Sequence, residues 1–101
     1  MKKIILLVPL LSLASFPALA DQALASSRNC MACHSVDKKL VGPAFKDVAS
    51  KYAGAKDSQA LLAGKIRKGS SGVWGPLPMP PNPRVSEADA QKLAAWVLSV
   101  K

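Results

Sequence analysis

The sequence predicts a small all-α domain, and two observations carry this prediction. Near the carboxyl end, apolar residues recur at i, i+3, i+4, i+7 and i+10, which is the spacing of one face of a helix. They are Ala90, Leu93, Ala94, Val97 and Val100. No segment shows the alternation of apolar and polar residues that is typical of a half-buried strand. We therefore expect about four short helices and no sheet.

The first 20 residues have the features of an export signal peptide. Two lysines open the chain, a mostly apolar stretch follows over residues 4–14, and residues 18–20 have the small side chains that a signal peptidase recognises. A membrane anchor is the alternative, but the apolar run is interrupted and shorter than the roughly 20 residues that a spanning helix needs. We expect cleavage before Asp21, one domain over residues 21–101, and an exported product that is not embedded in a membrane.

Two helices are expected in the first half of the domain. The first covers residues 21–29, with Asp21 as a cap. The second opens at Gly42 and Pro43, because proline is favoured in a first turn, and it ends at Gly54. Its apolar face is made of Phe45, Val48, Ala49 and Tyr52.

Two more helices are expected in the second half. The third is capped by Ser58 and stopped by Gly69. Its apolar side comes from Leu61, Leu62 and Ile66. The last helix begins with Ser86 and, three residues later, Asp89, a pair that resembles a capping box.

A long loop without predicted secondary structure separates these two helices, over residues 69–85. It contains five prolines: Pro76, Pro78, Pro80, Pro81 and Pro83. Each proline fixes φ and reduces the freedom of the unfolded chain, so the loop is stiff for its length. Such a loop is uncommon in a compact domain unless it has a function. We expect it to hold a functional residue in place.

Residues 30–34 read Cys-Met-Ala-Cys-His, a C-x-x-C-H motif typical of covalent haem attachment. The thiols of Cys30 and Cys33 can each add to one vinyl group of the porphyrin, which gives two thioether bonds. The imidazole of His34 can then ligate the iron. The motif predicts one haem c. A haem would also stabilise a domain of this size, which is too small for a large hydrophobic core.

Three other interpretations of the two cysteines explain less. A zinc site needs about four ligands, whereas the chain offers two cysteines and one histidine. A thioredoxin-like redox pair would need a βαβ unit, which is not predicted. An inert disulfide would leave the adjacent histidine without a role.

Met79 is the expected ligand on the other side of the iron. His34 is the only histidine, so the chain has no second imidazole. Met1 leaves with the signal peptide, and Met31 lies inside the attachment motif. Met79 lies within the proline-rich loop, although methionine is also a common core residue. A thioether raises the reduction potential, and a closed sixth position favours electron carriage over catalysis, so we expect no enzyme.

The charge of the domain favours acidic partners. Without the two lysines of the signal peptide, 12 of the 14 basic residues remain against 6 acidic residues, a net charge of +6. The basic residues are scattered and no recognition motif accompanies them, so nucleic acid is not an expected partner.

These residues resemble class I cytochromes c, in particular the short bacterial type called c-551 or c-552 (also c8). The resemblance covers nearly all of residues 21–101. It depends on CMACH, VGPAFKDVA, GVWGPLPMPPN and AAWVLSVK, which begin at residues 30, 41, 72 and 94. It implies a small fold of about four short helices wrapped around one covalently bound haem.

The resemblance also implies roles for residues around the haem. The carbonyl of Pro43 would accept the proton on Nδ1 of His34. Asn82 would hydrogen-bond near the sulfur of Met79. Trp74 would lie against the haem with its indole N–H toward a propionate, or else only pack in the core.

Lys65 departs from the family pattern. It stands where relatives often have an arginine that pairs with the buried propionate. Lysine keeps the charge but cannot make a planar two-bonded contact, and Arg67 is a possible substitute. We therefore expect the propionate to titrate, so that the reduction potential changes between about pH 5 and 8.

The implied function is that of a periplasmic monohaem electron carrier, acting as a monomer. It would take single electrons from a membrane cytochrome complex and pass them to a periplasmic nitrite reductase or terminal oxidase. The contact surface would be the haem edge, with apolar residues such as Leu40 and Pro80 inside a rim of lysines. The rim comprises Lys38, Lys39 and Lys46, each of which equally fits a merely solvated face.

Two alternatives remain open. One is a ligand-binding or peroxidase-type haem module with a labile sixth ligand. The other is a subunit of a larger complex.

Overall fold

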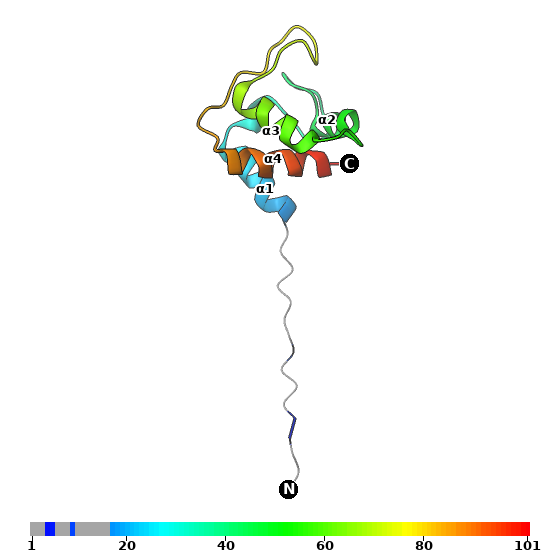
Figure 1. The fold of residues 1–101 in the computed structure, drawn as a ribbon, viewed down its shortest axis with the longest axis vertical. Coiled ribbons are helices and arrows are strands. Elements are labelled where there is room, and N and C mark those ends of the chain that lie inside the picture. Colours follow the sequence, from blue (N-terminus) through cyan, green and yellow to red (C-terminus); the bar gives the residue numbers. More distant parts are fainter. Residues whose placement is uncertain (1–3, 6–8, 10–16) are drawn as a thin grey trace.

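The computed structural model describes residues 4–5, 9 and 17–101, so most of the expected signal peptide lies outside the described residues. The described part contains four α-helices and one short 3-10 helix. These are α1 (Pro17–Ser27), η1 (Cys30–Ala32), α2 (Phe45–Tyr52), α3 (Ser58–Lys68) and α4 (Glu87–Ser99) (Figure 1). The only strand-like pairing in this part is an isolated bridge between Ser70 and Met79. The all-α prediction is confirmed. Among the described helices, none combines the length and the apolar character needed to span a bilayer.

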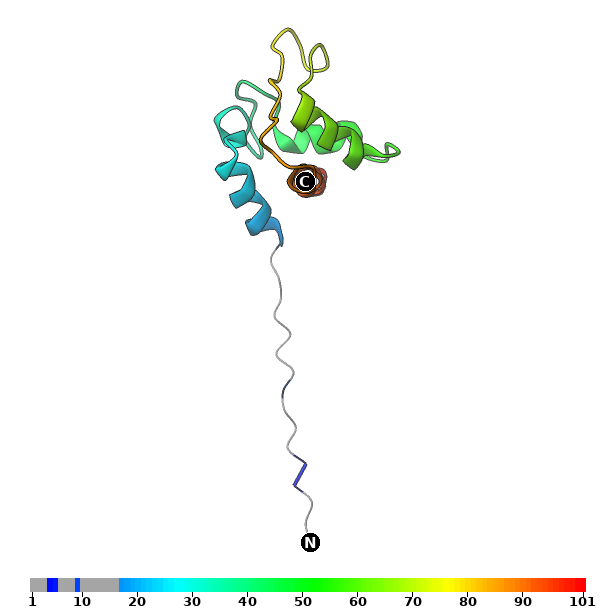
Figure 2. The same cartoon turned by 60° about the vertical axis from the view of Figure 1, so that its left-hand side comes forward.

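Helix α4 lies at the centre of the fold and packs against α1, α2 and α3 (Figure 2). The predicted stripe is buried at Ala90, Leu93, Ala94 and Val97, whereas Val100 is only half-buried. Trp96 widens the buried face beyond the stripe, since its ring meets that of Phe45 edge-on at a centroid distance of 5.2 Å. The aromatic pair therefore connects α4 to α2, which forms one side of the candidate site.

The start of α4 uses half of the expected capping box. Oγ of Ser86 accepts a hydrogen bond from the Asp89 backbone N–H at 3.1 Å. The Asp89 carboxylate does not return the bond; it pairs with Arg28, just beyond α1, at 3.3 Å. The Asp89 carboxylate therefore connects α1 to α4, whereas a capping box would have it accept a hydrogen bond from the Ser86 backbone N–H.

Two predicted starts in the first half are wrong. Helix α1 begins at Pro17, so Asp21 lies inside the helix and is not its cap. Helix α2 begins at Phe45 after an extended Ala44, so Pro43 precedes the helix by two residues. Outside the first turn, Pro43 has a carbonyl available for a side-chain partner.

The third helix also differs from the prediction at its start and on its surface. Asp57, not Ser58, precedes the helix; its φ is 58° and its side chain makes no capping bond. Leu61 was expected on the apolar side of this helix but is 47% exposed. The buried residues of the helix are Leu62 and Ala63. The predicted stop at Gly69 is confirmed, with a φ of 78°.

The proline-rich loop extends beyond α3 in both views (Figures 1 and 2). Its far end is tied back to α3, because the backbone N–H of Asn82 lies within 3.2 Å of the carbonyls of Ile66 and Arg67. Nε of Arg67 in turn donates to the carbonyl of Val85 at 3.1 Å. The loop is therefore anchored at the last turn of α3 before α4 begins.

Candidate cofactor site

A cavity of about 470 Å³ lies between the C-x-x-C-H segment, α2, α3, α4 and the proline-rich loop. This volume falls in the range of small-molecule and cofactor sites, and most of the side chains around the cavity are apolar. Seven of the eight site residues expected from the sequence line it: Cys30, Cys33, His34, Pro43, Lys65, Trp74 and Met79. The eighth, Asn82, does not.

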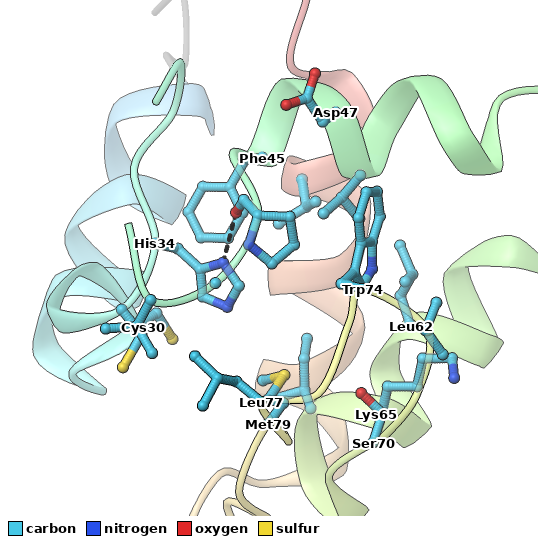
Figure 3. A pocket seen from close by; sticks show the side chains of 18 of the residues that line it. Cys30, His34, Phe45, Asp47, Leu62, Lys65, Ser70, Trp74, Leu77 and Met79 are labelled. Atoms are coloured by element: carbon cyan, nitrogen blue, oxygen red, sulfur yellow. Dashed lines mark hydrogen bonds between the residues drawn. The ribbon is translucent and has the colours of Figure 1, made fainter. Parts of the chain in front are cut away.

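The imidazole of His34 is held in one orientation. Its Nδ1 lies 2.8 Å from the carbonyl oxygen of Pro43. Since a carbonyl only accepts, Nδ1 carries the proton and Nε2 keeps a free lone pair. In Figure 3 the other ring nitrogen of His34 points away from the dashed hydrogen bond, toward the side on which Met79 lies.

Two neighbours pack directly against this imidazole. The Phe45 ring stacks on it at a centroid distance of 4.9 Å and an interplanar angle of 20°. Gly42 approaches so closely that an added Cβ would lie 2.5 Å from Cε1 of His34. From the sequence, Phe45 was expected only in the core and Gly42 only at a helix start. The Gly-Pro pair eight residues after the motif is the signal that marks this contact.

One tight turn brings the two thiols and the imidazole together. The carbonyl of Cys30 accepts from the backbone N–H of Cys33 at 3.2 Å and from that of His34 at 3.0 Å. Both thiols are free and half-buried, so Cys30 and Cys33 do not form a disulfide in this structure. Burial raises the pKa of the Cys30 thiol, which favours its uncharged form in the wall of an apolar cavity.

Met79 is positioned by its backbone. Its N–H donates to the carbonyl of Ser70 at 2.8 Å, and its carbonyl accepts from the N–H of Ser70 at 3.1 Å. The thioether is half-buried in the cavity beside Leu77 (Figure 3). Met31 does not line the cavity but packs against the hydrophobic core. Of these two methionines, Met79 alone contributes to the site.

The side-chain amide of Asn82 hydrogen-bonds to two backbone carbonyls. Its Nδ2 donates to the carbonyl of Ile66 at 3.0 Å and to that of Pro80 at 3.3 Å. An amide nitrogen has two hydrogens, so both are used on backbone carbonyls. Asn82 therefore fixes the backbone of the loop on α3.

The structure separates Lys65 from Arg67. Lys65 lines the cavity, whereas Arg67 does not. The guanidinium of Arg67 donates to the carbonyl of Val85 at 3.1 Å and to the carboxylate of Glu87 at 3.0 Å. Arg67 thus bonds at the junction of α3 and α4, and of these two residues only Lys65 lines the cavity.

Trp74 lines the cavity and is 40% exposed, so it is not part of the buried core. Nζ of Lys51 lies 5.5 Å from the centroid of its ring, at a cation–π distance. This contact joins the exposed part of the loop to the end of α2.

The donor set fits a haem better than a protein-bound metal ion. Within the described residues, no three His, Cys, Asp or Glu side chains gather closely enough to hold a metal ion, whereas a structural zinc site uses four ligands. A haem iron needs only axial ligands from the protein, and a histidine with a methionine is one known pair. Two free thiols, an imidazole with a bare Nε2 and a thioether all border one cavity.

Comparison with known proteins agrees with this geometry. The family model described as "Cytochrome c" matches residues 20–101. Cytochrome c-552 of Nitrosomonas europaea is 60% identical over 84 residues, which cover 83% of this chain and 82% of that protein. Cytochrome c-551 of Stutzerimonas stutzeri is 56% identical over the whole of both chains.

Solved structures show the same fold. The crystal structure of the wild-type Nitrosomonas europaea cytochrome c552 matches with a TM-score of 0.78 at 59% identity, covering 79% of this chain and 99% of that one. The chain thus belongs to the cytochrome c family, is similar to its c-551 and c-552 members, and binds one covalent haem c with its iron.

Proposed function

We propose that this protein is a soluble periplasmic carrier of single electrons, with His34 and Met79 as the axial ligands of its haem iron. The cytochromes c-551 and c-552 that it resembles are electron carriers, which supports the general activity. The observation that carries the proposal is the position of Met79. Its thioether lines the same cavity as His34, and its backbone is fixed by two hydrogen bonds to Ser70.

Each residue of the site has one task in this proposal. The haem supplies the one-electron chemistry, which takes place at its iron. Cys30 and Cys33 attach the haem as thioethers, and His34 ligates through Nε2. The Pro43 carbonyl fixes the imidazole orientation and makes Nε2 a better donor. The Met79 thioether favours the ferrous state and so raises the reduction potential.

Lys65 and Trp74 serve the polar edge of the haem. Both line the cavity, and each has an N–H donor that a propionate can accept from. With Arg67 bonded elsewhere, Lys65 is the candidate for the charged contact. Asn82 contributes by holding the loop on α3.

A fixed loop favours carriage over ligand binding. An enzymatic or ligand-binding haem protein needs a sixth position that opens readily. Here Met79 is held by Ser70, and the segment after it by Asn82, in a stretch whose prolines limit backbone motion. The geometry therefore supports a closed sixth position and an electron carrier, not an enzyme.

The proposed partners are redox proteins. We infer a membrane cytochrome complex as donor, a periplasmic nitrite reductase or terminal oxidase as acceptor, and a monomeric carrier reaching the periplasm through its signal peptide. Apolar side chains exposed near the mouth of the cavity support a docking surface there. Val41, Leu77 and Pro80 line the cavity, and Leu40 is the exposed neighbour of Val41 in the chain.

Carbon monoxide added to the reduced protein tests the proposal. Carbon monoxide binds ferrous haem only where the sixth position is open. We expect the wild-type spectrum to stay unchanged on mixing, and that of Met79→Ala to change at once. Met31→Leu is the matched control, because it removes a methionine outside the cavity and is expected to behave as wild type. A rapid spectral change in the wild type would contradict the proposal and support the ligand-binding alternative.

A further inference from the structure

We propose that Gly69 is the residue that positions Met79, through a backbone contact that only glycine permits. The inference rests on the proposed function, in which Met79 ligates the haem iron. It assigns to Gly69, at the end of α3, the placement of a side chain ten residues later. Gly69 acts as a positioning residue and does not itself contact the iron.

The first observation is how the chain leaves α3. Gly69 donates its N–H to the carbonyl of Lys65 at 2.9 Å, which closes the last turn, and then adopts φ 78° and ψ 177°. The next residue, Ser70, exchanges two backbone hydrogen bonds with Met79. The conformation of Gly69 thus directs the chain from the helix into its pairing with Met79.

The second observation is the closeness of the Met79 segment to the Cα of Gly69. A Cβ on Gly69 would lie 2.6 Å from the carbonyl oxygen of Met79, 2.9 Å from the nitrogen of Pro81 and 3.1 Å from the carbonyl carbon of Pro80. All three are backbone atoms, so no side-chain rotation can relieve the contact. A side chain at residue 69 would have to push residues 79–81 away from α3.

The pushed segment has little freedom to absorb the displacement. Ser70 holds it at Met79, and Asn82 ties its other end to the carbonyl of Ile66. Pro80 and Pro81 have fixed φ angles between these two attachments. The displacement is therefore expected to move Met79 and to weaken its bond to the iron.

Gly54, at the end of α2, provides the control. Its φ is 73°, close to that of Gly69, and it does not line the cavity. An added Cβ there would meet no atom within 4 Å. Gly54→Ala therefore places a side chain at a similar positive φ without the contact to residues 79–81.

The experiment is a titration of the oxidised, haem-loaded variants with imidazole. Binding is monitored by the loss of the weak sulfur-to-iron absorption band. We expect Gly69→Ala to bind imidazole about ten- to a hundredfold more tightly than wild type, the range that an overpacked contact typically produces. For Gly54→Ala we expect a change of no more than about threefold. Equal shifts in the two variants would overturn the proposal.

A second measurement on the wild type does not depend on the folding of any variant. Amide hydrogen exchange should be about tenfold slower or more at Ser70 and Met79 than at Val73 and Leu77, whose N–H groups make no backbone hydrogen bond in the described structure. Equally fast exchange at all four overturns the role of Gly69, even if Gly69→Ala cannot be prepared. A wild type without the sulfur-to-iron band contradicts the ligand assignment itself, which is a separate failure.

Discussion

Nδ1 of His34 donates a hydrogen bond of 2.8 Å to the carbonyl oxygen of Pro43, nine residues later in the chain. The connecting segment folds back through further backbone bonds, from Gly42 to Cys33 at 2.8 Å and from Phe45 to Ser35 at 2.9 Å. The imidazole is thereby fixed by the same segment that leads into α2. This relationship makes Nε2 the free nitrogen, and the orientation of the ring depends on the small size of Gly42.

Gly42→Ala is expected to displace the imidazole and impair haem binding. The added methyl would lie 2.5 Å from Cε1 of His34, and overpacking of this kind costs about 1–3 kcal/mol. We expect a lower yield of haem-loaded protein and a lower unfolding temperature, measured by absorbance and circular dichroism. Gly64→Ala is the control, because a Cβ there meets nothing within 4 Å. Wild-type stability and yield in Gly42→Ala would contradict the contact.

Lys65→Met is expected to lower the reduction potential. Removing a positive charge near the haem favours the oxidised state, and one partly screened charge about 10 Å away shifts the potential by roughly 20–40 mV. Cyclic voltammetry between about pH 5 and 8 measures both the shift and the expected pH dependence. Lys68→Met, an exposed lysine that does not line the cavity, is the control. A wild-type potential that stays flat over this range would refute propionate titration.

Charge reversal of Lys38 and Lys39 to glutamate is expected to slow electron transfer to an acidic acceptor at low salt. Both lysines are exposed; Lys39 lines the cavity, and Lys38 precedes it in the chain. Attraction between such charges and an acidic partner raises the association rate, and added salt screens this attraction. Stopped-flow rates at two ionic strengths measure the effect.

A control with the same change in net charge distinguishes a local effect from a general one. Lys56 and Lys92 are exposed and do not line the cavity, so their reversal leaves the docking surface intact. An equal slowing in both double variants would mean that the rim has no special part in docking.

Glu87→Gln is expected to destabilise the protein at neutral pH but not in acid. Hydrogen bonds from Gln91 and Arg67 lower the pKa of Glu87 below its ordinary value of 4.5. Its contribution to stability is therefore present above that value and is lost as the pH falls through the lower folded-state pKa. Urea unfolding at pH 7 and at about pH 3 should show a difference from wild type only at pH 7. A difference that persists in acid would show that the carboxylate charge is not its source.

The sequence was sufficient for the presence of the four α-helices, although not for all of their starts, and for seven of the residues that line the cavity. A C-x-x-C-H motif fixes three neighbouring side chains in one turn, and a periodic apolar stripe identifies α4 without tertiary information. The stiffness of a loop with five prolines pointed to Met79, which does line the cavity beside the motif.

What the sequence did not predict depends on contacts between distant segments. The carboxylate of Asp89 forms an ion pair with Arg28 because the end of α1 lies beside the start of α4. No local sequence pattern indicates that these two ends are neighbours. The bond from the amide of Asn82 to the carbonyl of Ile66, sixteen residues earlier, also joins distant segments. The tight approach of Gly69 to Met79 likewise arises only when the loop folds back on α3.

The visible spectrum of the oxidised, haem-loaded protein, with an intact mass on the same sample, is the most direct measurement. If His34 and Met79 ligate the iron of an electron carrier, the spectrum shows the weak sulfur-to-iron band of a low-spin haem. The mass then equals a chain beginning at Asp21 plus one haem. A bound haem with high-spin iron and no sulfur band would contradict Met79 as ligand and favour a protein that binds or transforms small molecules at an open iron.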